Sequence, residues 1–577
     1  MLKLLFTRIQ KREAIAAILC VVTVIFTIFF DLKLPEYMSG LTVLISTEGD
    51  VSEVINYGIR MLICVLGSAV LSIFDGYCAA KCAAGLALHA RQELFAHVMD
   101  FGQEEMNKFS IPSLITRTTD DFTQVQMYVS MSLVLAVRCP IMAIWAVTKI
   151  LEHSIELSMV TAIFVVVIMI FVFSVMFIVI PKFRLIQKLT DRINLVVNEN
   201  LTGINVVHAY NAENYQNEKF DDLNIKITKT QLFNQRLFAA LGPLLGLGLN
   251  GLSFVIYWVG AALILQTTFA DRLTYFSNIV VFSTYATYVL MSFMLLVLVF
   301  MLLPQARVSA ERILKVLDET IKLKQGSKDH KIRHGSIEFK NVDFKYPNNS
   351  KNTLQDINFS IDSGKTLAII GGTGSGKTSL INLIARLYDT SSGTVTIDGV
   401  DVSDYKFESL YNDLAFITQK AVIFSGTVED NIKFGHSSNK INEIDEYLKL
   451  AEAQNFKSND EISQRGKNIS GGQKQRLAIA RALARKPKII IFDDSFSALD
   501  YITDAKLRSN LKKYCQDSTK VIVAQRIGTI KDADKILVMK DGKIVGEGRH
   551  NELLKENEEY KQIALSQLSP EELGGVE

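Results

Sequence analysis

Long uncharged apolar runs dominate the first half of this 577-residue chain and limit what it can fold into. Residues 157–180 are 24 consecutive positions without a charged side chain. At about 1.5 Å of rise per residue, a helix of that length crosses a hydrocarbon core of about 30 Å. The runs at 237–270 and 273–306 are longer still, whereas the residues after 306 are mixed and polar. The sequence therefore predicts an all-helical membrane domain followed by a soluble domain.

Six membrane-spanning helices are expected, at about 14–32, 55–78, 127–150, 157–180, 240–268 and 273–303. Asp271 and Arg272 form a tight polar turn between the last two spans. The second span contains Asp75 and the third contains Arg138, and charged side chains in lipid are costly. We expect both residues to lie on cytoplasmic helix extensions or to pair within the bundle, with contact to a substrate as the alternative.

The connections on the two sides of the predicted membrane domain differ in their content of basic residues. The segments before the first span, between the second and third, and between the fourth and fifth are rich in lysine and arginine, whereas the opposite side has only Lys33, Lys149 and Arg272. The positive-inside rule then predicts a multi-pass protein of the cytoplasmic membrane, with both termini and the soluble domain in the cytoplasm. A basic start before an apolar run also resembles a signal peptide, but the run is long and no small-residue cleavage site follows it.

Overall charge and cysteine content point to no special partner. The chain has 62 basic and 60 acidic residues, and we expect no nucleic acid to bind. The cysteines are scattered and mostly lie in or beside the spans, so we expect them to pack in the core rather than to bind a metal. They are Cys20, Cys64, Cys78, Cys82, Cys139 and Cys515.

A complete phosphate-binding loop lies in the soluble half, directly after a predicted buried strand at 366–370. Backbone N–H groups of such a loop cradle phosphate oxygens at the positive end of the following helix. Lys377 is expected to reach the β- and γ-phosphates, and Thr378 to ligate magnesium. The loop predicts binding of ATP and Mg²⁺ and consists of Gly371, Gly372, Thr373, Gly374, Ser375, Gly376, Lys377 and Thr378, with Ser379 beside it.

Two further motifs follow this loop. Residues 489–492 are a hydrophobic strand that ends in Asp493, which is expected to orient magnesium. Ser470, Gly471, Gly472 and Gln473 precede a strongly helical stretch, and Ser470 can cap that helix. The glycines allow a phosphate to approach the backbone, and the helix dipole faces it.

This order of motifs resembles the ATPase of ABC transporters, and the membrane half resembles the exporter-type branch of that family. The resemblance rests on Phe109, Arg117 and Asp120–Asp121 in the first cytoplasmic connection, on residues 199–211 in the second, and on residues 309–313 after the sixth span. It implies a six-helix exporter-type transmembrane domain in a domain-swapped dimer, followed by an α/β P-loop ATPase with a helical subdomain. We expect the transmembrane domain at 1–320, a linker at 321–335, the ATPase at 336–570 and a tail at 571–577.

The resemblance also assigns roles to single residues. Tyr346, after a predicted strand at 336–344, would stack on adenine. Gln419 would touch magnesium and sense a short transverse helix, and such helices are expected around 102–110 and 208–213. Ser470–Gln473 would contact the ATP held by a second chain, and Asp500 would couple the two sites across the dimer interface.

Two positions depart from the family pattern. Asp494 stands where the catalytic glutamate is usual, and Gln525 stands where the switch histidine is usual. A carboxylate shorter by one methylene retreats by roughly 1–1.5 Å, and a misplacement on that scale costs on the order of a hundredfold in rate. The resemblance thus points to the degenerate-site subunit of a heterodimeric bacterial multidrug exporter. Its expected partners are a second half-transporter, the lipid bilayer and a hydrophobic small-molecule substrate.

Three alternatives stay open: a slow homodimeric exporter, an ATP-regulated membrane protein without cargo, and an exporter-shaped importer. The substrate cannot be read from one chain of a shared cavity. Aromatic and methionine side chains of the sixth span could line an adaptable cavity, although core packing is the simpler interpretation for each of them. They are Phe282, Tyr285, Tyr288, Met291 and Met294.

Overall fold

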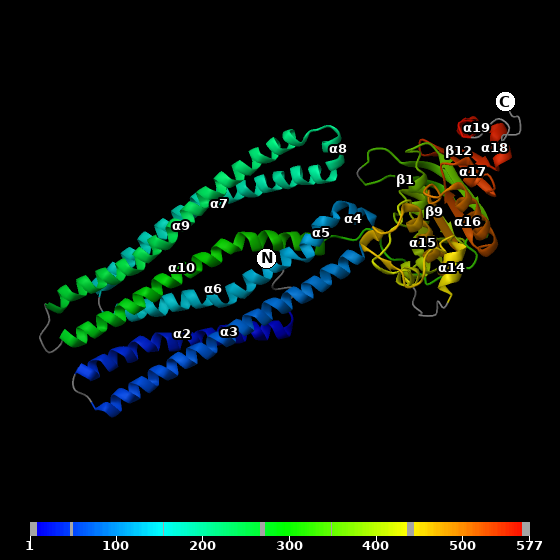
Figure 1. Cartoon of the computed structure of the whole chain (residues 1–577). Helices are drawn as coiled ribbons and strands as arrows, with labels where there is room; N and C mark the ends of the chain where they lie inside the picture. Colours follow the sequence, from blue (N-terminus) through cyan, green and yellow to red (C-terminus); the bar gives the residue numbers. More distant parts are fainter. Residues whose placement is uncertain are drawn as a thin grey trace. The chain divides into compact units, whose positions relative to one another are not determined.

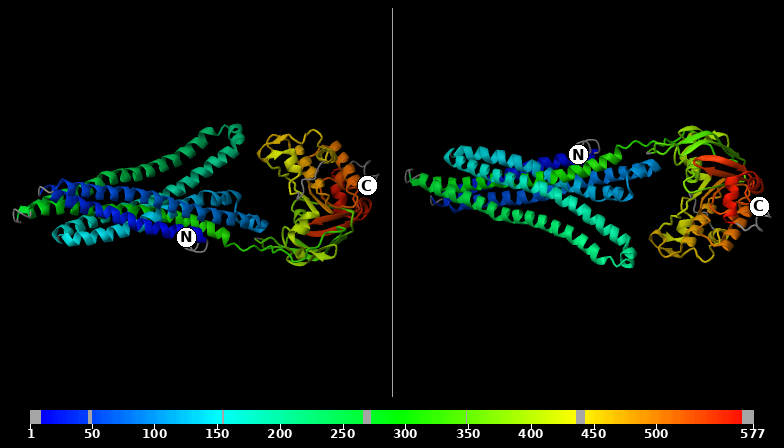
Figure 2. Two further views of the ribbon diagram at one scale, coloured as in Figure 1. Left: turned by 90° about the horizontal axis from the view of Figure 1, so that it is seen from below. Right: turned by 90° about the horizontal axis from the view of Figure 1, so that it is seen from above.

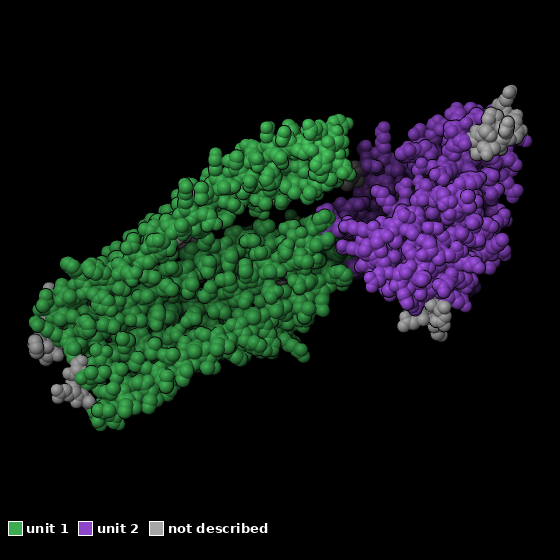
Figure 3. All heavy atoms as spheres, in the orientation of Figure 1, with its two compact units in different colours: residues 1–98, 112–318 green, residues 99–111, 319–577 purple. Residues whose placement is uncertain are grey.

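The computed structural model describes residues 9–46, 50–153, 155–265, 272–347, 349–435 and 443–567. The expected tail at 571–577, the end of the fifth span at 266–268 and Asp271 of the polar turn lie outside these residues. The chain divides into two compact units (Figure 3). Unit 1 combines residues 1–98 and 112–318, and unit 2 combines residues 99–111 and 319–577.

The described residues of unit 1 include six helices that are long and apolar enough to cross a membrane, as the sequence predicts. They run well beyond the apolar spans, because charged and amphipathic turns continue each helix past the hydrocarbon core. Figure 1 shows them as elongated rods in one bundle. They are α2 (Lys11–Ser46), α3 (Val51–Met99), α6 (Asp120–His153), α7 (Ile155–Thr202), α9 (Glu213–Leu265) and α10 (Arg272–Leu317).

The six helices pack in two groups. Helix α6 packs along α10, and α7 packs along α9. The pair α7 and α9, joined by the short helix α8 (Ile204–Ala209), diverges from the other four long helices toward its α8 end (Figures 1 and 2). The α7–α9 pair therefore has long stretches that the rest of unit 1 does not cover.

The charged residues expected to pair within the bundle do so. Asp75 is 2% exposed and accepts hydrogen bonds from Thr23 and from Thr27 Oγ1, the latter at 3.0 Å. Arg138 Nη2 lies 2.6 Å from Asp31 Oδ2, so a cation from α6 meets an anion from α2. Both costly charges thus have partners on other helices, and the expectation of pairing is confirmed.

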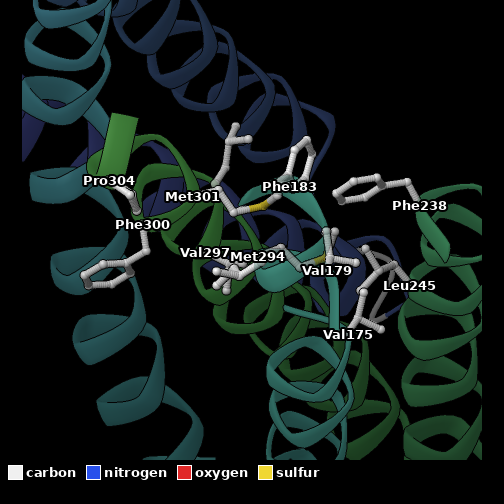
Figure 4. Close-up of a pocket in the computed structure, with 12 residues that line it drawn as sticks. Val175, Val179, Phe183, Phe238, Leu245, Met294, Val297, Phe300, Met301 and Pro304 are labelled. Carbon is white, nitrogen blue, oxygen red and sulfur yellow. The ribbon is translucent and has the colours of Figure 1, made fainter. Parts of the chain in front are cut away.

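The aromatic residues of the sixth span are mainly core residues. Phe282 and Tyr285 are fully buried, and the Tyr285 hydroxyl donates to the carbonyl of Leu32 at 2.9 Å. Tyr288 and Met294 pack against the same core while keeping part of their surface. Core packing is therefore confirmed for Phe282 and Tyr285, whereas Met291 is 38% exposed. Met294 also lines an apolar cavity between α7, α9 and α10 (Figure 4).

Short helices interrupt the two long connections, the one after α3 and the one after α7. In the first, α4 (Gln103–Lys108) and α5 (Ile111–Thr118) follow α3, and α4 lies within the predicted 102–110 segment. In the second, α8 begins right after Gly203, four residues before the predicted segment at 208–213. The predicted segment starts too far along the chain because Gly203, rather than the polar residues after it, ends α7. Asn211, with φ +48°, leads into α9.

Unit 2 is built on a six-stranded sheet in the order β12-β11-β3-β10-β9-β6. All neighbours are parallel except the β11–β12 pair. Strands β9 and β10 are buried along their whole length, as runs of isoleucine and valine between two helical layers require. The strands are β3 (Thr366–Gly371), β6 (Leu414–Ile417), β9 (Ile489–Asp493), β10 (Thr519–Val523), β11 (Lys535–Lys540) and β12 (Lys543–Gly548).

An antiparallel sheet in the order β2-β1-β4-β5 and the pair β7–β8 complete the strands among the described residues of unit 2. Strand β1 (Ile337–Phe344) matches the strand predicted at 336–344, and the other strands are β2 (Leu354–Ile361), β4 (Ser392–Ile397), β5 (Val400–Asp401), β7 (Gly426–Thr427) and β8 (Glu461–Ile462). The helices are α11 (Lys377–Ile384), α12 (Phe407–Asn412), α13 (Val428–Ile432), α14 (Ile444–Leu450), α15 (Gly471–Ala484), α16 (Tyr501–Tyr514), α17 (Ile527–Ile530), α18 (His550–Glu556) and α19 (Glu558–Leu565).

Candidate nucleotide-binding site

The phosphate loop and the residues Gln419, Asp493, Asp494 and Gln525 gather at one edge of the six-stranded sheet, whereas Tyr346, Ser470–Gln473 and Asp500 belong to other elements. Strand β3 ends at Gly371 and β9 at Asp493, while Gln419 and Gln525 each lie two residues beyond the ends of β6 and β10. Because these strands are parallel, their carboxyl ends meet at the same edge, which is where open α/β sheets bind ligands.

The glycine-rich loop connects β3 to α11. Gly374 and Gly376 have φ values of +80° and +101°, a region that favours glycine, and a Cβ added at Gly372 or Gly374 would meet nothing within 4 Å. The loop thus leaves its backbone accessible to a phosphate. Lys377 Nζ donates to the carbonyls of Gly371 at 2.9 Å and Gly372 at 2.7 Å, so the ammonium lies over the loop. Burial lowers the pKa of Lys377, although both Asp494 and Asp493 oppose that shift.

The side chains expected to ligate magnesium lie together. Thr378 Oγ1 donates to Asp493 Oδ1 at 3.4 Å, and Asp493 is only 8% exposed. Burial raises the pKa of Asp493, and the neighbouring Asp494 raises it further. A buried carboxylate and a hydroxyl are oxygen ligands of the kind that Mg²⁺ prefers, so the residues fit the ion.

Asp494 is held by the amides of two glutamines. Gln419 Nε2 donates to Asp494 Oδ2 at 3.2 Å, and Gln525 Nε2 donates to the same oxygen at 3.0 Å. Asp494 itself adopts φ +47°, a conformation that few non-glycine residues take. Burial raises the pKa of Asp494, and the hydrogen bond from Gln419 opposes that effect. The two departures from the family pattern are therefore direct neighbours that bind each other.

Tyr346 belongs to an aromatic cluster beside the loop. Its hydroxyl lies 3.0 Å from Ser379 Oγ, and its ring meets the Tyr388 ring edge to face at 5.2 Å between centroids. The sequence interpretation missed Tyr388, because nothing near it in the chain marks it as part of the site. Asn107 of α4 donates to the Tyr388 hydroxyl at 3.3 Å, so this tyrosine connects the cluster to α4.

The start of α15 forms a separate polar surface. Ser470 is the N-cap residue of α15, as predicted: its backbone N–H donates to Gln473 Oε1 at 2.8 Å, and Ser470 Oγ accepts from the Gln473 N–H at 3.3 Å. Gly471 is exposed, and a Cβ added there would meet nothing within 4 Å. Gln475, which the sequence interpretation missed, is 2% exposed and donates to the Thr418 carbonyl at 3.2 Å, next to Gln419.

Asp500 caps α16 within its own chain. Its carboxylate accepts from the Thr503 N–H at 2.9 Å, and this bond lowers the pKa of Asp500. The residue is exposed, so the cap leaves its outer face accessible. The structure thus gives Asp500 a structural role beside the coupling role that the resemblance implies.

Comparisons with known proteins agree with this geometry. Residues 354–497 match the family described as ABC transporter, and residues 17–294 match the ABC transporter transmembrane region. A Mycobacterium tuberculosis protein described as an uncharacterized ABC transporter ATP-binding protein is 33% identical over 589 aligned residues that cover 100% of both chains. A Bacillus subtilis protein with the same description is 33% identical over 518 residues, covering 88% of this chain and 89% of the relative.

A solved structure gives the same fold over nearly the whole chain. A bacterial Atm1-family ABC exporter with ATP bound superposes with a TM-score of 0.79 at 21% identity, covering 98% of this chain and 99% of that one. At this identity the likeness shows the fold alone. The chain therefore belongs to the ABC transporter family, as an exporter-type half-transporter whose single polypeptide joins six membrane-spanning helices to the ATP-hydrolysing domain that drives transport.

Proposed function

We propose that this chain is the weakly hydrolysing subunit of a heterodimeric exporter that moves hydrophobic or amphiphilic small molecules out across the cytoplasmic membrane. The observation that carries the proposal is the pair of amide donors on Asp494, 3.2 Å away in Gln419 and 3.0 Å away in Gln525. A short carboxylate whose oxygen already accepts two hydrogen bonds is poorly placed to activate a water molecule.

Gln525 is a second reason to expect slow hydrolysis at this site. A histidine at the switch position can become a cation, whereas an amide stays neutral at every physiological pH. The negative charge that develops on a transferring phosphoryl group therefore has one stabiliser fewer at this site. ATP bound by Gly371–Thr378 and Tyr346 would stay intact for longer than ATP at a site with the usual residues, with Mg²⁺ held by Thr378, Gln419 and Asp493.

The surface at Ser470–Gln473 is expected to be functional, unlike the site at Asp494. Each residue of this motif that would contact phosphate is the one usual in the family. In this proposal it completes the competent site of the partner subunit, and Asp500 couples the two sites. Residues 1–320 form the membrane domain, 321–335 the linker and 336–570 the ATPase, with both termini in the cytoplasm. The exposed helix α8 docks on the partner's ATPase.

A slow homodimer is the second candidate, and one observation favours it. Burial raises the pKa of Asp494, which makes its carboxylate a stronger proton acceptor than an exposed aspartate. A homodimer would then hydrolyse ATP slowly at two identical sites.

ATPase assays on the purified full-length chain separate the two. The chain is assayed alone and together with the half-transporter that copurifies with it from its own cells, each with Asp494→Glu and Asp494→Ala. For the heterodimer, we expect the lone chain to be nearly inactive, the pair to be active, and Asp494→Ala to change the turnover of the pair by less than about twofold, because turnover belongs to the other site. A lone chain that hydrolyses ATP briskly and loses activity on Asp494→Ala would establish the homodimer.

A further inference from the structure

The backbone turn that carries Gln525 is bound by the side chain of Gln567, near the end of the described chain. Gln567 Nε2 donates to the Gln525 carbonyl at 2.8 Å, and Gln567 Oε1 accepts from the Ile527 N–H at 2.9 Å. One amide therefore binds the backbone on both sides of Arg526. Turning this amide over would place donor against donor and acceptor against acceptor, so the two contacts specify one orientation.

The Ile527 N–H is a donor that helix α17 cannot satisfy itself. It is the first N–H of a helix of 4 residues, and such a group has no carbonyl partner within its own helix. Arg526 stands at the N-cap position, and among the described residues its side chain makes no capping hydrogen bond. Ile527 is fully buried, and a buried N–H without a partner is costly. Gln567 thus supplies, from 40 positions along the chain, the cap that Arg526 does not.

Gln567 is itself held by the core of unit 2. It follows the end of α19, and its N–H donates to the Ala564 carbonyl at 3.0 Å. Ala564 is fully buried in the apolar cluster that also contains Ile527 and Ile530 of α17. Helices α19 and α17 therefore pack on one core, which fixes the position of Gln567 relative to the turn.

Strand β10 holds the other side of Gln525. The Ala524 N–H, directly after the last residue of β10, donates to the Ile369 carbonyl of β3 at 3.2 Å. The backbone of Gln525 is thus fixed by the sheet on its strand side. On its helix side, the position of this backbone depends on the contacts with Gln567.

The Gln525 side chain is the group that this turn presents to the site. Its Nε2 donates to Asp494 Oδ2 at 3.0 Å. An amide nitrogen carries two N–H groups, so one can bind Asp494 while the other donates to a phosphate oxygen of ATP. Hydrogen bonds weaken steeply as their geometry departs from the ideal, so both contacts depend on where the turn holds the Gln525 backbone.

We propose that Gln567 is a positioning residue of the ATP site, which holds the Gln525 amide beside Asp494 and so lengthens the time for which this chain retains ATP. The inference rests on the proposed function, because it explains how a slowly hydrolysing site keeps its nucleotide. It adds a determinant outside the nucleotide-binding motifs, since Gln567 acts on the turn through contacts with backbone groups.

A double-mutant cycle tests the proposal in the full-length chain, together with any subunit that copurifies with it. The protein is loaded with Mg²⁺ and azido-ATP, chased with excess ATP and irradiated after increasing times, so that the label on this chain measures its retention of nucleotide. Gln567→Ala is compared in the unchanged chain and in Gln525→Ala. The matched control is Gln562→Ala on α19, at an exposed side chain whose Nε2 donates to Glu558 Oε1 at 3.4 Å.

We expect Gln567→Ala to shorten retention by about two- to tenfold, the range that the loss of one hydrogen bond gives. In Gln525→Ala the same change should have an effect of less than about twofold, because no amide is left to position. Gln562→Ala should retain nucleotide as the unchanged chain does. Gln567→Glu keeps an acceptor for the Ile527 N–H and removes the donor to the Gln525 carbonyl, so it should shorten retention while α17 stays capped. If Gln567→Ala does not fold, Gln567→Glu takes its place in the cycle.

An equal loss of retention in both backgrounds overturns the proposal, because Gln567 would then act through the fold of unit 2 rather than through Gln525. Unchanged retention in the variant of Gln567 also overturns it. The proposed function is judged by which subunit turns ATP over, whereas this cycle compares nucleotide retention on one chain. Failure of this proposal is therefore distinguishable from failure of the proposed function.

Discussion

The phosphate-loop edge of the sheet and the start of α15 are the two regions expected to contact ATP, and they differ in how far their polar groups are already hydrogen-bonded within the chain. At the edge, side chains bind partners from their own chain: Lys377 binds loop carbonyls, and Asp494 accepts from Gln419 and Gln525. At the start of α15, the capping bonds between Ser470 and Gln473 leave an exposed glycine face with open space above it. The side chains of the first region are hydrogen-bonded within the chain and include the two unusual residues, whereas the second region presents an exposed glycine face.

In our proposal the two regions serve different steps, one turnover and the other retention of ATP. A surface that serves the partner's nucleotide must keep its shape, whereas a site that only holds ATP tolerates Asp494 and Gln525. The comparison makes the two regions separable by mutation, since changes at one should affect turnover and changes at the other should affect nucleotide retention.

The largest effect is expected from Gly471→Val. A Cβ added at Gly471 meets nothing within 4 Å, so we expect the fold to be kept. In our proposal the valine side chain fills the face offered to the partner's ATP. Turnover of the pair should fall on the order of a hundredfold, the loss typical of a misplaced catalytic contact. Steady-state ATPase assays of the pair measure it, with Gly471→Ala as the smaller graded step. Unchanged turnover with Gly471→Val would remove the open surface from the competent site.

An intermediate effect is expected from Lys377→Ala. The change removes the cation over the phosphate loop, so this chain should bind ATP at least about tenfold more weakly, because a charge-assisted contact to phosphate is lost. Turnover of the pair should fall by no more than about threefold. Photolabelling with azido-ATP, scored separately for each subunit, gives the affinity. A collapse of turnover as large as that of Gly471→Val would contradict the division between the two regions.

The smallest effect is expected from Asp494→Asn. Burial raises the pKa of Asp494, so the folded state binds its proton more tightly than the unfolded state, and stability falls as pH rises through that folded pKa. The neutral amide removes this loss while its oxygen can still accept from both glutamines. Thermal unfolding of the nucleotide-free chain at pH 7 should therefore shift to a higher temperature than that of the unchanged chain. The gain should shrink at acid pH, and a fall in melting temperature at pH 7 would refute the electrostatic account.

Much of the membrane unit could be predicted from the sequence because hydropathy is a local signal. The six spans follow from runs of apolar residues, and the phosphate loop follows from a short motif between a strand and a helix. Contacts between residues that lie far apart in the sequence could not be predicted. Arg138 looks unpaired along the chain, and its partner Asp31 lies 107 positions away.

The site shows the same limit. Asp494 and Gln525 could be recognised as unusual from their motifs, but their hydrogen bond joins residues 31 positions apart and required the parallel sheet to form. Tyr388 carries no motif at all and enters the site only through its ring contact with Tyr346. The start of α8 was misplaced because a glycine that ends a helix looks in sequence like a glycine within one.

The short helices α4 and α8 differ in how far their side chains are buried. Helix α4 is anchored inside unit 2, where Glu105 is 3% exposed and accepts from the Lys322 N–H at 3.1 Å. Helix α8 has no buried residue, and Ile204 and Val206 are 42% and 60% exposed. If α8 docks on a partner subunit, as we propose, chains that find no partner would leave this apolar surface open to proteases, and degradation of such chains would keep the two subunits in equal amounts.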